Sequence, residues 1–104
     1  MGRGYVGVLS VEMHLPTSTS LKDKRREVRR VKAGLVNRLS FSVAEVGDHD
    51  LWQRATISAA IVTRDARDAE RLVDEALKLL DTDPEFQMVG RIRSVVAVDD
   101  DWPA

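Results

Sequence analysis

The sequence predicts an α+β fold of the ferredoxin-like type, a split βαβ sandwich in which two helices cover one face of a four-stranded antiparallel sheet. Two hydrophobic periods alternate along the chain, one of two residues for strands and one of about 3.6 residues for helices. The resulting order is strand, helix, strand, strand, helix, strand. The chain has 104 residues, of which 43% are hydrophobic, and this length can bury a two-layer core. We expect a single domain over residues 1–104, ending in an acidic tail over 98–104.

The first part of the chain predicts a strand and then a helix. Apolar or small residues occupy the odd positions from Tyr5 to Leu15, which is the alternation of a strand with one buried face, and Pro16 ends it. Ser20 precedes the helix and is its expected N-cap. The helix ends near residue 38, and its apolar stripe recurs at helical spacing: Leu21, Val28, Val31, Leu35 and Leu39.

The rest of the chain predicts a hairpin, a second helix and a last strand. A short strand over 41–46 is joined to a strand over 55–61 by the polar turn 47–50. The second helix covers 66–80, with Asp65 as its expected cap, and the last strand covers 86–98. These two strand–helix–strand units give the split βαβ arrangement.

Charge is distributed unevenly along the chain. The net charge is only −1, yet residues 21–38 contain eight bases and two acids, a local charge of +6, while the remainder carries eight bases and fifteen acids. A single basic segment on an otherwise acidic protein indicates a binding surface for polyanions more specifically than a uniformly basic composition would. The candidate nucleic-acid-binding residues are Lys22, Lys24, Arg25, Arg26, Arg29 and Lys32.

Two other interpretations of this segment remain open. Charged side chains on an exposed helix also keep a protein in solution, although such helices usually mix the two signs at spacings of three or four residues. An acidic protein surface, including the second helix of this chain or a partner copy, is another target for the same charges. Arginine favours phosphate because its planar guanidinium donates two parallel hydrogen bonds.

The predicted hairpin gathers polar residues around one turn. Glu45 lies in an otherwise apolar strand, where a carboxylate is expected to need a partner. Asp50 and the neighbouring His49 are common turn residues, and consecutive residues rarely converge on one ion, so no metal site is expected. Trp52 is expected to cover the edge of the core rather than to stack on a nucleic-acid base.

Several other function classes have no support in the sequence. Cysteine is absent, and the glycines form no phosphate-binding loop or dinucleotide motif. We expect no enzyme and no cofactor; the enzymatic alternative would need His14, Glu45 and Asp50 to meet in one pocket. Neither a secretory leader nor a span of membrane length is apparent, which favours the cytoplasm and no membrane partner.

The sheet face opposite the helices is expected to be uncovered and partly apolar. Such a face is a typical surface for pairing with a second copy. The expected interface residues are Val8, Ala60 and Val95, and the expected assembly is a homodimer.

Two segments, SLKDKR at 20–25 and FSVAEVGDHDLWQRA at 41–55, resemble the YlxP-like family of small bacterial proteins, a domain of unknown function. The departure from the family pattern lies at 40–42, where an Asn commonly precedes the strand. The resemblance implies a ferredoxin-like fold, no established activity and frequent encoding beside translation and ribosome-maturation factors. The matching positions are Ser20, Leu21, Lys22, Lys24, Arg25, Val43, Ala44, Glu45, Asp50, Trp52 and Gln53, with Asp23 where the family often has Glu.

Taken together, these features favour a binding module for RNA or a ribosomal subunit that uses the basic first helix. A homo-oligomer through the open sheet face is compatible with it, because the two surfaces lie on opposite faces of the sheet.

Overall fold

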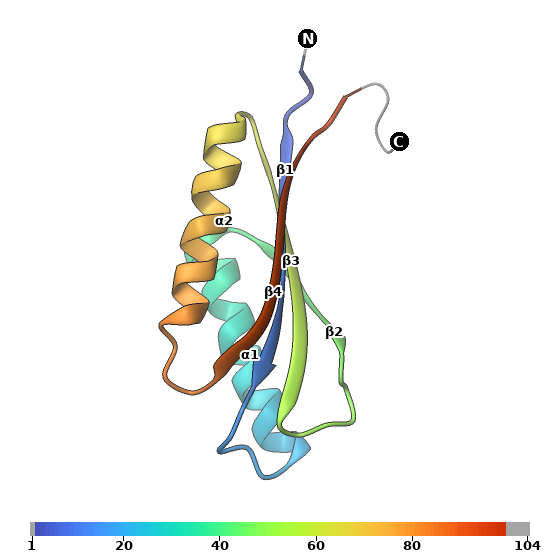
Figure 1. Ribbon diagram of the computed structural model, residues 1–104, viewed down its shortest axis with the longest axis vertical. Helices are drawn as coiled ribbons and strands as arrows, with labels where there is room; N and C mark the ends of the chain where they lie inside the picture. The colour runs from blue at the N-terminus through green and yellow to red at the C-terminus, as the bar shows by residue number, and fades with distance from the viewer. Residues whose placement is uncertain (1, 100–104) are drawn as a thin grey trace.

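The computed structural model describes residues 2–99, and its secondary structure follows the predicted order (Figure 1). The ends of each element lie within two residues of the predicted ends. Residues 100–104 of the predicted acidic tail lie outside the described residues. The elements are β1 Tyr5–His14, α1 Leu21–Leu39, β2 Ser42–Gly47, β3 Arg54–Thr63, α2 Ala66–Asp81 and β4 Gln87–Ala97.

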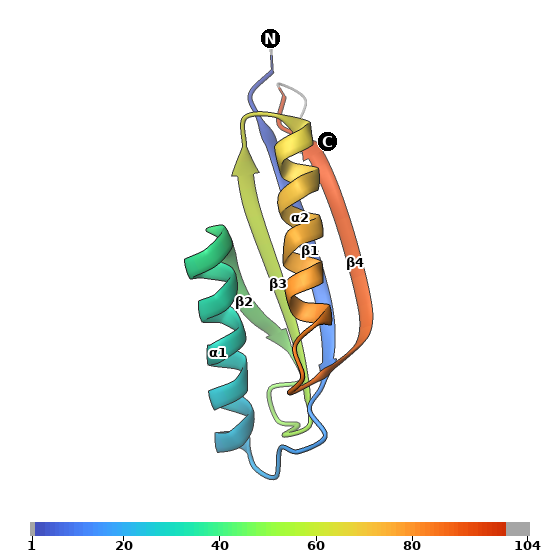
Figure 2. The same ribbon diagram turned by 90° about the vertical axis from the view of Figure 1, so that its left-hand side faces the viewer.

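The four strands form one antiparallel sheet in the order β2-β3-β1-β4. Both helices lie on the same face of this sheet, and the opposite face is uncovered (Figures 1 and 2). This is the predicted ferredoxin-like split βαβ sandwich, so the fold class is confirmed. The register shifts once between β1 and β4, at Glu12 and Met13, and once between β2 and β3, at Glu45 and Gly47.

The hydrophobic core lies between the helices and the sheet. The odd positions of β1 face it, and Leu9, Val11 and Met13 are fully buried. Each helix buries one stripe and exposes its other sides to solvent. Within residues 2–99, no helix combines the length and the apolar composition needed to cross a membrane. The helices contribute Val28, Val31, Leu35, Ala69, Val73, Ala76, Leu77 and Leu80 to the core.

Two local conformations fix how the helices sit on the sheet. At the end of α1, Ser40 adopts a left-handed conformation with φ 64°, and its N–H bonds to the carbonyl of Val36 at 3.0 Å. The chain therefore turns into β2 within two residues. In β1, a Cβ atom on Gly7 would lie 2.8 Å from Cγ2 of Val73, so the glycine allows α2 to approach the strand closely.

The faces of β4 differ from the sequence-based expectation. Alternation in the sequence predicts Arg91, Arg93 and Val95 on the open face, but the register pairs them with Val11, Leu9 and Gly7, which face the helices. Directly paired residues share one face of a sheet. The guanidinium of Arg93 binds Glu70 and Asp74 of α2. The physical reason is the register shift in β4: Met88 pairs with Met13 and Gly90 with Glu12, so Val89 is an extra residue and the alternation changes face there.

Candidate functional site

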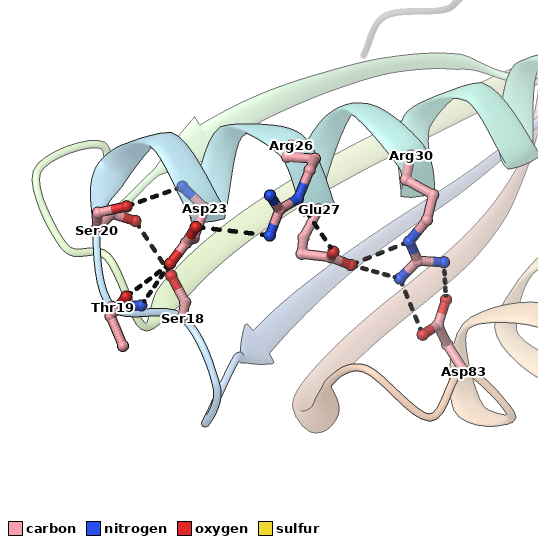
Figure 3. Close-up of polar contacts among 8 residues, drawn as sticks. All are labelled: Ser18, Thr19, Ser20, Asp23, Arg26, Glu27, Arg30 and Asp83. Atoms are coloured by element: carbon pink, nitrogen blue, oxygen red, sulfur yellow. Dashed lines mark hydrogen bonds and ion pairs between the residues drawn. The ribbon is translucent and has the colours of Figure 1, made fainter.

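The basic helix begins with a set of capping contacts (Figure 3). The Ser20 hydroxyl accepts a hydrogen bond from the Asp23 N–H at 3.1 Å, which confirms the predicted cap. The Asp23 carboxylate accepts bonds from the backbone N–H of Thr19 at 3.0 Å and from its hydroxyl at 2.8 Å. These bonds from Thr19 hold the pKa of Asp23 below its ordinary value. Asp65 occupies the corresponding position before α2, but its side chain makes no capping bond.

Two arginines of the basic helix are neutralised within the molecule. Arg26 lies 3.5 Å from Asp23 and 3.9 Å from Glu27. The guanidinium of Arg30 lies 2.9 Å from Glu27 and donates two bonds to Asp83, at 2.7 and 3.0 Å (Figure 3). The bonds to Asp83 raise the pKa of Arg30. Burial alone would raise the pKa of Asp83, but the bonds from Arg30 and a backbone N–H lower it.

Lys24 is not part of an exposed surface, which corrects the prediction for this residue. Its side chain is 2% exposed, and its Nζ lies 3.0 Å from Oε2 of Glu45. The same ammonium donates hydrogen bonds to the carbonyls of Asp48 at 2.6 Å, His49 at 3.3 Å and Arg54 at 3.2 Å. The three N–H donors of a buried ammonium need acceptors within the protein, because the group has left bulk water. Lys24 therefore fastens the β2–β3 hairpin to the first turn of α1.

Four predicted cations remain accessible, and we call them the α1 stripe: Lys22, Arg25, Arg29 and Lys32. Three of them are exposed and Lys32 is half-buried. Their spacings of three, four and three residues place them along one side of the helix. None of the four forms an ion pair with a carboxylate among residues 2–99. Charged groups of the stripe are thus available to a partner, unlike those of Arg26.

The acidic second helix is not the partner of the basic helix. Two of its acids, Glu70 and Asp74, bind Arg93 of β4. Two others, Asp68 and Glu75, pair with Arg71 on the same helix. The basic helix instead reaches an acid beyond the end of α2: Arg30 binds Asp83, which follows that helix.

The residues of the predicted hairpin motif separate into a structural set and an exposed set. Glu45 pairs with Lys24, which is the partner that its place in an apolar strand predicts. The Gln53 amide donates to the carbonyl of Ser18 at 3.2 Å and ties the hairpin to the loop before α1. Trp52 is 52% exposed, so the expectation that it covers the core edge is wrong. With Asp50 it lines a shallow depression of about 320 Å³.

The groups of the enzymatic alternative do not meet. Glu45 pairs with Ile57 across the sheet and faces the helices, whereas His14 pairs with Arg54 on the open face. The His14 ring instead contacts Gln87 at 3.3 Å. Among residues 2–99, no group of three or more histidine and acidic side chains is arranged to hold a metal ion.

The open sheet face is apolar at one end and polar at the other. Val8 and Ala60 lie on it as predicted and are directly paired. Val95 does not, since it pairs with Gly7 on the helix side. Ile92, which the alternation of the sequence does not place here, pairs with Ser10 on this face and is 73% exposed. Ile92 lies on this face because the alternation of β4 changes at the register shift between Met88 and Gly90, which the residue pattern alone does not reveal.

The comparisons with known proteins agree with this structure. The family model described as "Protein of unknown function (DUF503)" matches residues 6–92. The Bacillus subtilis (strain 168) "Uncharacterized protein YlxP" is 28% identical over 82 residues, which cover 79% of this chain and 89% of that protein. Both findings confirm the resemblance carried by the two sequence motifs.

Solved structures share the fold at low sequence identity. A dimeric protein of unknown function with a ferredoxin-like fold from Bacteroides fragilis NCTC 9343 has a TM-score of 0.52 and 13% identity. The match covers 94% of this chain and all of the other. A dimeric ferredoxin-like protein from an uncultured marine organism has a TM-score of 0.46 and 13% identity, over 95% of this chain and 99% of the other.

Proposed function

The chain belongs to the DUF503 family, whose function is unknown, and from its surfaces we propose that it is a non-enzymatic module that binds RNA through the α1 stripe. One observation carries this proposal: four accessible cations lie along one side of a helix without an intramolecular carboxylate partner among residues 2–99. With a rise of about 1.5 Å per residue, the stripe is about 15 Å long. It offers one cation to each of up to four backbone phosphates.

The arrangement of pairs on the same helix argues against solubility as the sole role. The helix carries two acids, Asp23 and Glu27. Asp23 pairs with Arg26, and Glu27 pairs with Arg26 and with Arg30, which also binds Asp83. Like charges three or four residues apart repel one another, so an unneutralised stripe is mildly destabilising. A polyanion would remove this repulsion and release its own counterions on binding.

Fluorescence anisotropy with a labelled single-stranded RNA, over a series of salt concentrations, tests the proposal. Affinity is expected to fall with salt at a log–log slope of about −0.7 per phosphate contacted. The double variant Arg25→Glu/Arg29→Glu should lose most of the binding and lower the magnitude of the slope by at least about 1.4. Both residues are exposed, so the fold should survive.

A matched control is available on α2 and the turn before it. Arg64 and Arg67 are exposed and make no ion pair with a described carboxylate. The variant Arg64→Glu/Arg67→Glu changes the net charge by the same amount and should bind RNA nearly as well as the wild type. Equal loss in both double variants would mean that only the net charge matters, and unchanged binding after reversal of Arg25 and Arg29 would refute the proposal.

Ribosomal RNA is the RNA to test first, because the resemblance places relatives beside translation and ribosome-maturation genes. Co-sedimentation with purified ribosomal subunits at low and high salt should show association that the Arg25→Glu/Arg29→Glu variant loses. Retained association in this variant would assign ribosome contact to another surface.

A second candidate function, self-association through the open sheet face, is supported by its exposed apolar side chains. Val62, which pairs with Val6, lies at the apolar end of this face, and Ile92, which pairs with Ser10, lies nearer its middle; each is 73% exposed. Contiguous exposed apolar residues are typical of protein interfaces. The Bacteroides fragilis protein with this fold is described as dimeric, so a second copy of the chain is the first occupant to test.

Light scattering coupled to gel filtration tests this candidate. The wild type is expected to be a dimer at micromolar concentration, and Ile92→Lys should convert it to a monomer. Val36→Lys is the control, because Val36 is 45% exposed on α1 and lies outside the sheet face. A wild type that stays monomeric at high micromolar concentration would end this proposal.

A further inference from the structure

The β2–β3 hairpin presents two large apolar side chains to solvent. Leu51 and Trp52 are each 52% exposed. Tryptophan usually buries most of its large surface, because burial of the indole is strongly favourable. An indole held half outside the protein is typical of a contact surface.

The hairpin that carries Trp52 is held in place by polar contacts. Nζ of Lys24 binds three of its carbonyls, at 2.6 to 3.3 Å. The Gln53 carbonyl accepts a bond from the Leu15 N–H at 2.9 Å, and the Gln53 side chain binds the Ser18 carbonyl at 3.2 Å. A fixed segment loses little conformational freedom on binding, so the backbone that carries the indole is preorganised.

The side chains around the indole suit a flat aromatic ligand with negative charge nearby. Trp52 lines a depression of about 320 Å³ together with Asp50, Leu51, Gln53 and Arg54. Arg54 has no ion pair with a described carboxylate. Indole and guanidinium planes are the groups on which unpaired bases stack. The carboxylate of Asp50 would repel a phosphate but can accept a hydrogen bond from the amino group of a base.

This depression lies beside the beginning of the α1 stripe. Lys24, which binds the hairpin, directly precedes Arg25 of the stripe and follows Lys22 by two residues. Figures 1 and 2 both place the β2–β3 connection at the same end of the molecule as the start of α1. A strand whose phosphates contact the first residues of the stripe therefore lies at the same end of the molecule as the depression.

We propose that the depression at Trp52 binds one unpaired base of single-stranded RNA, which stacks on the indole beside the Arg54 guanidinium while the α1 stripe holds the neighbouring phosphates. This inference rests on the proposed RNA-binding function for the phosphate contacts, and it adds the class of RNA. A duplex keeps its bases stacked inside the helix and cannot fill the depression.

The fluorescence of Trp52 provides a direct test. The chain has two tryptophans, Trp52 and Trp102, so a Trp102→Phe background leaves Trp52 as the only reporter. Titration with a twelve-residue oligoadenylate should quench its emission. An abasic sugar-phosphate oligomer of the same length should bind the stripe in a salt-dependent manner without the quenching, and duplex RNA should behave like the abasic probe.

Variants at the hairpin separate stacking from phosphate binding. In anisotropy measurements, Trp52→Ala should weaken oligoadenylate binding by about 5- to 100-fold and leave abasic binding unchanged, while Trp52→Phe should retain most of the affinity. Val46→Ala is the matched control, because Val46 is 53% exposed on the same hairpin and does not line the depression; it should bind like the wild type. Circular dichroism checks that each variant is folded.

The outcomes distinguish this inference from the function on which it rests. If Trp52→Ala binds oligoadenylate as tightly as the wild type, or the abasic probe quenches Trp52 equally, the stacking site is refuted while phosphate binding by the stripe stands. Such a result would indicate that the exposed side chains of the hairpin bind an apolar protein surface instead. If no probe binds at low salt, both proposals are overturned.

Discussion

At the scale of single residues, Lys24 shows how a basic side chain can be structural. Its ammonium has a carboxylate and three carbonyls within hydrogen-bonding distance and is almost entirely buried. Helical spacing identifies the apolar stripe of α1 but cannot distinguish a lysine that points inward from its exposed neighbours. The carboxylate of Glu45 in an apolar strand was the available signal, because a buried acid requires a cation.

Replacement of Lys24 by methionine should therefore destabilise the protein strongly. Removing one partner of a buried pair leaves Glu45 and the hairpin carbonyls without a donor, and we expect Lys24→Met to lower the free energy of unfolding by about 3 kcal/mol. Urea denaturation followed by circular dichroism measures this change. Lys22→Met is the control, because Lys22 lies two residues earlier on the exposed side of the helix. This substitution should change stability by less than about 0.5 kcal/mol.

A double variant identifies the pair as the cause. Lys24→Met/Glu45→Gln should lose less stability than the sum of the two single variants, since the second substitution removes the unpaired carboxylate. Additive losses would mean that the ammonium acts only through the hairpin carbonyls.

At the scale of secondary-structure elements, the hydrophobic periods of the sequence predicted every helix and strand. They assigned residues of β4 to the wrong face of the sheet. Period two locates a strand and does not say which side is buried when both sides carry charged and apolar residues. The register shift between Met88 and Gly90 turns Arg91 and Arg93 to the helix side, where Arg93 binds Glu70 and Asp74. The pairing with β1 reveals this shift, and the residue pattern of β4 does not.

The bond between α1 and the connection after α2 predicts a dependence of stability on pH. The pKa of Asp83 is lowered from 3.8 by Arg30, so its contribution to stability is fully present above about pH 4 and is lost as the pH falls through the lowered value. Asp83→Asn should reduce the free energy of unfolding by about 1 kcal/mol at pH 7. The difference from the wild type should shrink below pH 4.

Urea denaturation at pH 7 and at pH 3 measures both quantities. Asp81→Asn, an exposed acid two residues earlier, is the control and should show no comparable difference at pH 7. A difference for Asp83→Asn that stays constant down to pH 3 would exclude the ion pair as its source.

Two glycines should respond oppositely to alanine. A methyl group on Gly7 would meet Val73 at 2.8 Å and force α2 away from β1, so Gly7→Ala should cost about 1 to 3 kcal/mol. On Gly34 the nearest atom would be Cδ2 of Leu79 at 3.8 Å, which is an ordinary contact. Gly34→Ala should stabilise α1 by up to about 1 kcal/mol. Thermal unfolding of both variants checks the signs, and a stable Gly7→Ala variant would contradict the close packing.

At the scale of the whole molecule, the α1 stripe and the open sheet face point in different directions, because the helices cover only one face (Figure 2). Sequence patterning could predict both surfaces in outline. It could not predict the exposed Trp52, since the exposure depends on how Lys24 fastens the hairpin to α1 and Gln53 fastens it to the loop before α1.

A dimer through the sheet face would carry two stripes on its outer sides. Long RNA that reaches both stripes should then bind more tightly than a short oligomer, because the second contact is intramolecular. Ile92→Lys should abolish this preference for length and leave binding of a twelve-residue oligomer unchanged. Anisotropy with short and long RNA at equal protein concentration measures the ratio, and a preference that persists in the monomeric variant would exclude avidity.

The register shifts at the two outer strands bear on how copies of this protein avoid fibres. A flat, unbroken outer strand is a template on which further chains can add, and local kinks and charged side chains discourage such growth. Here β2 is only six residues long and kinked beside Glu45, while β4 is kinked opposite Glu12 and carries Arg91 and Arg93. Both rims of the sheet are thus poor seeds for amyloid, and the proposed pairing through the open sheet face would leave them as the outer edges of a closed pair.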